Sequence, residues 1–129
     1  METNLKFNSA ICTSREQSEQ LLALGLKKET ADMVILEHPR KEGRYFYIAK
    51  EDANWDGFPA WSLHRLLELF IEVNGNFFDW EFEISPGKLI IRRSNRMMFI
   101  WSKNVYDSII TCIEWLIKSG YFNKEYLEE

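Results

Sequence analysis

The stretch FDWEFEISPGKLIIRRSNRMMFIW, residues 78–101, decides the fold class. It opens with alternating apolar and acidic side chains, a period of two that is typical of a strand with one buried face. Ser-Pro-Gly-Lys at 85–88 has the composition of a turn, and Ser-Asn at 94–95 marks a second turn. The stretch therefore predicts three consecutive antiparallel strands, over residues 78–84, 89–92 and 97–101.

The side chains of this stretch also predict the register of its first hairpin. We expect three cross-strand pairs, Ile84 with Leu89, Phe82 with Ile91 and Glu81 with Arg92. In this register apolar residues face each other on one side of the sheet, and opposite charges face each other on the other side. A shift by one residue would turn the apolar set of one strand to the wrong face.

The carboxylates of Asp79, Glu81 and Glu83 form a row on one face of the first strand. Alternate residues of a strand lie about 7 Å apart, so this row would bind a hard cation only with a ligand from another segment. The basic residues of the following hairpin can neutralise the row instead. We therefore expect cross-strand ion pairs on a solvated face, and no metal site.

Three further segments have the apolar spacing and the end signals of helices. We expect them to begin at Ser14, Ser62 and Asn104, whose side chains can cap a helix N-terminus. They are expected to end at Gly25, at Asn74-Gly75 and at Gly120. A pair of strands over 33–37 and 44–49 and a short terminal turn over 123–127 complete the chain.

The order of these elements is helix, two strands, helix, three strands and helix, which predicts an α+β fold. We expect a single domain over residues 1–129, in which three helices pack mainly on one face of an antiparallel sheet of about four to five strands. The apolar stripes predict one core, formed by Leu66, Leu67, Phe70, Trp80, Phe82, Ile109, Ile113 and Leu116.

The composition of the 129 residues excludes several classes of protein. Hydrophobic residues make up 46% of the chain and charged residues 28%, which excludes a disordered tail, a fibre and a linker. The net charge of −4 argues against nucleic-acid binding by the whole protein. The first residues carry no apolar signal segment, and no uncharged run is long enough to cross a membrane. We therefore expect a cytoplasmic protein that does not bind a membrane.

The chain has none of the nucleotide-binding, metalloprotease or hydrolase motifs by which many enzymes are recognised. Glu68, four residues after His64 on the second helix, could orient this histidine as a general base, but an exposed histidine with a weak local pair is the favoured interpretation. Cys112 lies in the apolar pattern of the third helix and is predicted to be a small buried side chain. These observations favour a protein without enzymatic activity, and they predict no catalytic residue and no cofactor.

Aromatic residues make up 15% of the chain, and three of them, Trp55, Phe58 and Trp61, lie in a loop before the second helix. Large aromatic side chains in a loop either close the edge of a core, the commoner role in a small domain, or anchor a partner. We expect Trp61 to fold onto the second helix and Trp55 to stay at the surface. The candidate binding residues are therefore Trp55, Asp56, Phe58, Trp61 and His64.

Three stretches of the chain are similar, in their order and combination, to a known group of short proteins. They are residues 16–33, 59–69 and 106–127, which include the sequences LLALGL, PAWSL and CIEWLIK. Together they resemble proteins of no established activity from gut Bacteroidota and from the phages and mobile elements of these bacteria. The resemblance implies a genomic setting and no chemistry, and it transfers no catalytic residue.

Two functions remain open at this point. The first is a phage or mobile-element accessory protein that has no enzymatic activity and binds another protein through the aromatic loop, residues 55–61, and the neighbouring sheet face. The alternative is a domain, with or without enzymatic activity, that binds a small molecule or a nucleotide with the same loop. In that case the aromatic rings would stack on the ligand, and His64 or Asp56 would make polar contacts. Both functions are compatible with a homo-oligomer.

Overall fold

A computed structural model of the protein describes residues 10–37, 45–50, 57–71, 81–85, 87–93 and 96–128. The helices are α1 (Arg15–Ala23), α2 (Leu63–Ile71) and α3 (Val105–Lys118), together with the short 3-10 helices η1 (Lys28–Thr30) and η4 (Lys124–Tyr126). The strands are β1 (Met33–Glu37), β2 (Tyr45–Ala49), β3 (Phe58–Ala60), β4 (Glu81–Ser85), β5 (Lys88–Arg93) and β6 (Arg96–Trp101). Within these described ranges, no helix has both the length and the apolar character needed to cross a membrane.

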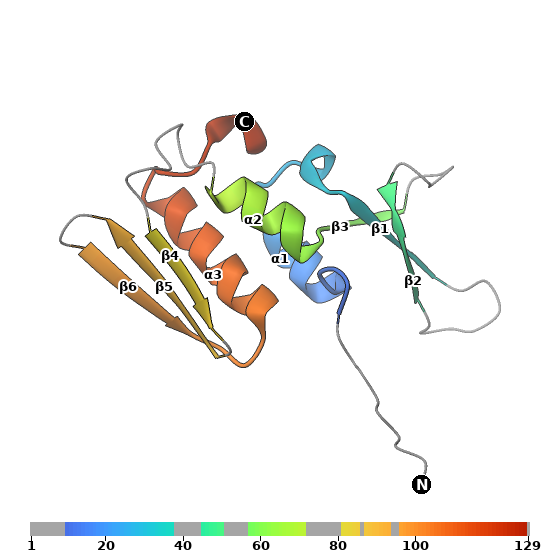
Figure 1. The fold of residues 1–129 in the computed structure, drawn as a ribbon. Helices are drawn as coiled ribbons and strands as arrows, with labels where there is room; N and C mark the ends of the chain where they lie inside the picture. Colours follow the sequence, from blue (N-terminus) through green and yellow to red (C-terminus); the bar gives the residue numbers. More distant parts are fainter. Residues whose placement is uncertain are drawn as a thin grey trace, which may run out of the picture.

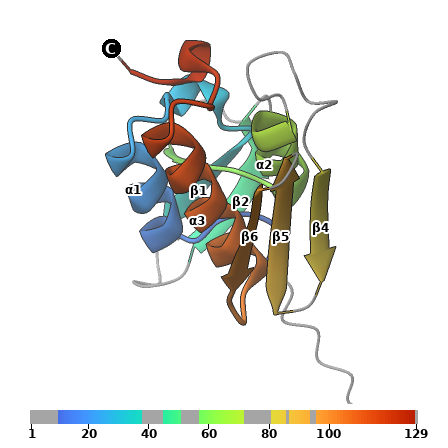
Figure 2. The same cartoon turned by 90° about the vertical axis from the view of Figure 1, so that its left-hand side faces the viewer.

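The strands form two antiparallel sheets of three strands each, in the orders β2–β1–β3 and β4–β5–β6. The helices lie between the two sheets (Figure 1), and a view from the side shows α3 next to β6 (Figure 2). The α+β class and the antiparallel pairing are therefore confirmed. The prediction of one sheet with about four to five strands is not matched, because β1 and β2 belong to a separate sheet, to which the segment before α2 adds β3 as a third strand.

Strand β3 replaces part of the loop that the sequence predicts before α2. It pairs with β1, where Pro59 lies opposite Val34. Proline cannot donate a backbone hydrogen bond, and it is tolerated here because β3 is an edge strand of its sheet. At Gly57 a Cβ atom would lie only 2.8 Å from Leu36 Cδ2 and 3.1 Å from the Ile35 carbonyl oxygen. This close approach to β1 explains why the position is a glycine.

The β4–β5 hairpin has the register that the sequence predicts. Ile84 lies opposite Leu89, Phe82 opposite Ile91 and Glu81 opposite Arg92. In β6, Ile100 lies opposite Leu89, and both side chains are buried in the core shared with the helices. The part of the predicted first strand before residue 81 lies outside the described residues.

The described helix ends follow the signals in the sequence. Ser14 caps α1 in a capping box, in which its hydroxyl accepts from the Gln17 backbone N–H and the Gln17 side chain accepts from the Ser14 N–H. Asn104 caps α3, where its Oδ1 accepts from two first-turn N–H groups at 2.8 and 3.4 Å. Gly120 follows α3 with a φ of 78°, a left-handed conformation that glycine adopts without strain.

The core lies where the helices meet the β4–β5–β6 sheet. Most of its predicted members are fully buried, namely Leu66, Phe70, Ile109, Ile113 and Leu116. Leu67 and Phe82 are partly buried and pack against this cluster, and the ring centroids of Phe82 and Phe70 are 4.3 Å apart in an edge-on arrangement. The remaining predicted member, Trp80, lies outside the described residues.

Replacement of Ile113 tests the assignment of the core. Because this side chain is fully buried on α3, Ile113→Ala should lower the free energy of unfolding by about 2–5 kcal/mol. Thr111→Ala, on the exposed face of the same helix, is the matched control and should change it by less than about 0.5 kcal/mol. Urea titrations measure both values, and equal effects of the two variants would contradict the assigned buried face.

Candidate functional site

The binding residues predicted from the sequence do not form a shared surface in the described part of the chain. Trp55 and Asp56 lie outside the described residues. Phe58 belongs to β3, Trp61 lies between β3 and α2, and His64 is in the first turn of α2. Of these three, Phe58 is half-buried, Trp61 is buried and His64 is exposed.

Trp61 is fully buried and closes the core. Its indole Nε1–H donates to Thr30 Oγ1 at 3.0 Å, and its backbone N–H donates to Thr13 Oγ1 at 3.0 Å. The Thr13 N–H in turn donates to the Trp61 carbonyl at 2.8 Å. This is the structural role that the sequence predicts for Trp61. A fully buried ring offers no surface to a ligand or partner, so Trp61 no longer belongs among the candidate binding residues.

The N-terminus of α2 is occupied by groups of the chain itself. Asp32 Oδ1 accepts from the Ser62 N–H at 2.8 Å, and Asp32 Oδ2 accepts from the Ser62 hydroxyl at 2.5 Å. Ser62 Oγ also accepts from the Arg65 N–H at 3.1 Å, and Arg65 Nε donates to the Thr30 carbonyl at 2.7 Å. The carboxylate of Asp32 thus takes the place that an anionic ligand would occupy at a helix N-terminus.

Phe58 is likewise engaged within the chain. The guanidinium carbon of Arg15, in the first turn of α1, lies 4.5 Å from the centroid of its ring. The side chain also packs against a small cluster formed by Cys12, Ile35 and Ala60. Phe58 therefore joins α1 to the β2–β1–β3 sheet, and this contact accounts for its burial.

His64 lies on the solvent side of α2. Its side chain is 86% exposed, and its Nε2 is 3.8 Å from Glu68 Oε1. The sequence predicts this weak local pair. A general base would need a pocket and an orienting partner within hydrogen-bond distance.

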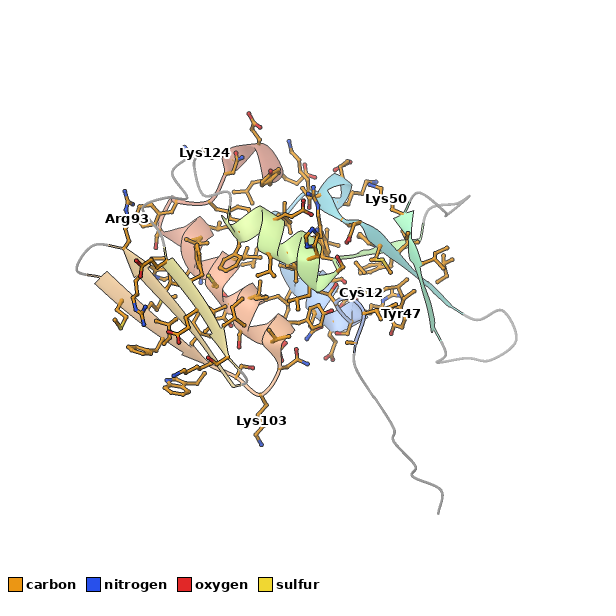
Figure 3. The ribbon with its side chains drawn as sticks, viewed as in Figure 1. Cys12, Tyr47, Lys50, Arg93, Lys103 and Lys124 are labelled. Carbon is orange, nitrogen blue, oxygen red and sulfur yellow. The ribbon has the colours of Figure 1, made fainter. Side chains whose placement is uncertain are left out.

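Both cysteines are buried free thiols, and Figure 3 labels Cys12 near the N-terminal end of α1. Burial, and to a lesser extent the charge of Asp32, raise the pKa of the Cys12 thiol to about 11. Burial alone raises the pKa of Cys112. Since the thiolate is the nucleophile, thiols that stay protonated at neutral pH are unsuited to covalent catalysis.

The acidic residues of β4 form ion pairs across the hairpin. Arg92 lies across the hairpin, 3.7 Å from Glu81 Oε2 and 3.1 Å from Glu83 Oε2. These are the cross-strand pairs that the sequence predicts, whereas Asp79 lies outside the described residues. In the described ranges there is no group of three or more His, Cys, Asp or Glu side chains that could hold a metal ion.

The largest apolar exposure in the described part of the chain is instead on the outer face of β6. Met97, Phe99 and Trp101 are 52%, 50% and 72% exposed. The rings of Phe99 and Trp101 are nearly parallel, with an interplanar angle of 9° and centroids 6.4 Å apart. These three side chains form a row that points away from the helices, and we call it the β6 row.

The backbone N–H and C=O groups of the β6 row also point away from β5. Ser102 lies one step beyond the last ladder pair, and its N–H donates to the Gly87 carbonyl at 3.1 Å. Hydrogen-bonded pairs alternate along an antiparallel ladder, so Met98 and Ile100 also direct their N–H and C=O groups to β5. The backbone groups of the β6 row then point to the other side, where no described strand pairs with β6.

An open groove of about 500 Å³ runs along the same edge, between β6 and α3. Its α3 wall is formed by Thr111, Glu114, Trp115 and Lys118. Lys118 Nζ lies 2.6 Å from Glu114 Oε1, so the charged rim of this wall is neutralised within the helix. The groove thus combines a strand edge, an aromatic side chain and a rim without net charge.

Residues 97–101 are predicted from the sequence to be a strand, with no further role. The signal for the β6 row is nevertheless present, because all five residues are apolar and do not alternate with polar ones. Such a strand has two apolar faces. Here the helices cover one face, whereas Met97, Phe99 and Trp101 on the other face are at least half exposed.

Replacement of two tryptophans tests the assignment of Trp61 to the core and of Trp101 to the surface. Trp61→Ala should lower the free energy of unfolding by about 3 kcal/mol or more, because it removes a fully buried side chain and leaves Thr30 without its indole partner. Trp101→Ala is the matched control and should change it by less than about 1 kcal/mol, because its ring is largely exposed. Urea titration measures both, and similar losses would contradict the different burial of the two rings.

The raised pKa of the Cys12 thiol predicts that the free energy of unfolding falls at alkaline pH. Its pKa rises from 9.0 to about 11 on folding, so the unfolded chain releases this proton at a lower pH than the folded chain. The stabilisation is therefore complete below pH 9 and is lost as the pH rises through about 11. In urea titrations over this range, wild-type protein should lose on the order of 2 kcal/mol more than Cys12→Ala. Equal losses in the two proteins would contradict the burial of the thiol.

Comparison with protein-family models, with curated proteins and with solved structures finds no match. The chemistry of the described residues is then the guide to function, and the β6 row is its most distinctive feature.

Proposed function

We propose that the protein has no enzymatic activity and acts by binding protein through the edge and outer face of β6. One observation carries this proposal: Met97, Phe99 and Trp101 have both exposed apolar side chains and backbone groups that point away from their sheet. A strand that adds to this edge would gain main-chain hydrogen bonds and would cover apolar surface at the same time.

The residue types of the β6 row support a binding role. Natural sheets commonly protect an edge strand with charged residues, proline or a covering segment. The exposed positions of β6 carry Met, Phe and Trp instead. Trp is among the residues most enriched at the centres of protein interfaces, and Met and aromatic residues are enriched there in general. The same surface without a partner would favour aggregation.

The aromatic loop gives weaker support for protein binding. Phe58 and Trp61 are engaged in contacts within the chain, so a contact through this loop would depend on Trp55 and Asp56. A ligand site built from Trp61 and His64 is also weakly supported. Trp61 is buried, whereas His64 lies on an exposed helix face, so the two side chains do not line one site.

The resemblance to short proteins of gut Bacteroidota suggests a setting for such an activity. We propose an accessory role for a phage or mobile element in the cytoplasm, where a small domain acts by occupying a surface of another chain. This setting rests on the resemblance, whereas the choice of β6 as the contact rests on its geometry.

Variants of β6 and a matched surface variant test the proposed function. Trp101→Ser and Phe99→Ser remove exposed apolar side chains from β6, and Ile11→Ser removes one that is 58% exposed and does not belong to β6. Immobilised protein is incubated with differently tagged copies of itself and with a bacterial lysate. We expect both β6 variants to bind roughly tenfold or more weakly than wild type, and Ile11→Ser to bind like wild type.

Hydrogen exchange of the complex locates the contact. The amides of Met97, Phe99 and Trp101 should exchange more slowly in the bound state, because each gains an acceptor. Unchanged exchange at these amides, together with β6 variants that bind like wild type, would contradict the proposed function. Loss of binding in Trp55→Ala alone would instead place the contact on the aromatic loop.

A further inference from the structure

We propose that the partner of β6 is β6 of a second copy of this chain. The two strands would pair antiparallel about a twofold axis at Phe99 and would join the two β4–β5–β6 sheets into one sheet of six strands. This inference rests on the proposed function, because it identifies the occupant of the same edge.

The backbone of β6 is suited to pairing with itself. In a twofold antiparallel pair centred on Phe99, this residue lies opposite its own copy, and Met97 lies opposite Trp101 of the second copy. The residues whose backbone groups point away from β5 then lie opposite one another, and two hydrogen bonds per opposed pair give about six in all. A centre moved by one residue would place either Met97 or Trp101 opposite a residue beyond the strand. The register centred on Phe99 is therefore the one that uses the whole row.

The side chains of the row complement each other in this register. On the outer face, Phe99 would pack beside Phe99 of the second copy, and Trp101 beside Met97 of the second copy. Aromatic pairs and sulfur–aromatic contacts are both favourable across neighbouring strands. The two rows would merge into one apolar cluster, so residues that are each at least half exposed in a single chain would be covered.

The groove beside β6 would close in the same arrangement. A twofold axis perpendicular to the sheet keeps both α3 helices on one face, one on each side of the new seam. On this face Met98 lies opposite Ile100 of the second copy, and the groove walls that contain Trp115 face each other. Because Glu114 and Lys118 already neutralise each other within each copy, the walls bring no net charge of one sign into the seam.

The expected interface is small. An aromatic side chain can bury roughly 150–250 Å², so three side chains that are 50–72% exposed supply only part of the ~800 Å² that each partner contributes to a standard interface. Main-chain hydrogen bonds and the groove walls would add to this contact. We therefore expect a reversible dimer with a dissociation constant in roughly the micromolar range.

The mass of the purified chain tests the dimer. Sedimentation velocity from roughly 1 to 500 µM, a range that spans micromolar dissociation constants, should show the mass rise from 15.4 kDa toward twice that value. Phe99→Arg places two like charges opposite each other at the axis and should keep the chain monomeric, whereas Ile11→Ser should dimerise like wild type. Circular dichroism of each variant shows whether it is folded.

Engineered cysteines test the register. Opposed residues of a hydrogen-bonded pair have Cα atoms about 5.5 Å apart, which suits a disulfide. Phe99→Cys should therefore form a disulfide-linked dimer under mild oxidation. Met97→Cys and Trp101→Cys should each remain unlinked alone and should link when the two are mixed. Cys12 and Cys112 are buried and serve as the unreactive background.

The outcomes separate this inference from the proposed function. A chain that stays monomeric, a dimer that survives Phe99→Arg, or linking by Met97→Cys alone would each overturn the twofold pairing at Phe99. If the chain is monomeric but the β6 variants still lose a captured protein, β6 binds a different chain and the proposed function stands. If the chain is monomeric and the β6 variants bind like wild type, both proposals are wrong.

Discussion

The buried indole of Trp61 is the contact on which the two halves of the described structure depend. Its ring fills the core, and its N–H has to find an acceptor there, because an unpaired buried donor would cost roughly 1–3 kcal/mol. Thr30 Oγ1 supplies that acceptor. Thr13 forms two further hydrogen bonds, one with the backbone N–H of Trp61 and one with its carbonyl. Since Trp61 lies between β3 and α2, these bonds fix the position of the β2–β1–β3 sheet relative to the helices.

The same junction also accounts for the polar side chains near the start of α2. Polar groups gather around the start of α2, but Asp32, Ser62, Arg65 and Thr30 satisfy one another. Among the described residues, no buried side-chain nitrogen or oxygen lacks a hydrogen-bond partner. A fully hydrogen-bonded cluster of this kind rigidifies the fold around the start of α2.

The two outer strands of the β4–β5–β6 sheet differ in a way that bears on function. On the outer face, β4 carries the charged side chains of Glu81 and Glu83, which both form ion pairs with Arg92, whereas β6 carries the apolar β6 row. Charge on an edge strand discourages pairing with another chain, and apolar residues encourage it. This difference between the two edge strands is the reason that the proposed contact is placed on β6 and not on β4.

The sequence alone determined the helix starts at Ser14 and Asn104, the α+β class and the register of the β4–β5 hairpin, because these features depend on local interactions. Caps, periodicity and cross-strand charges act between residues close in the chain. Only the tertiary structure decided that the strands divide into two sheets and that Phe99 and Trp101 are exposed. An apolar strand such as β6 has the same sequence pattern whether one or both of its faces are covered. Whether the second face is covered depends on where the helices pack. Their positions are set by contacts between residues far apart in the chain, such as Thr13 with Trp61.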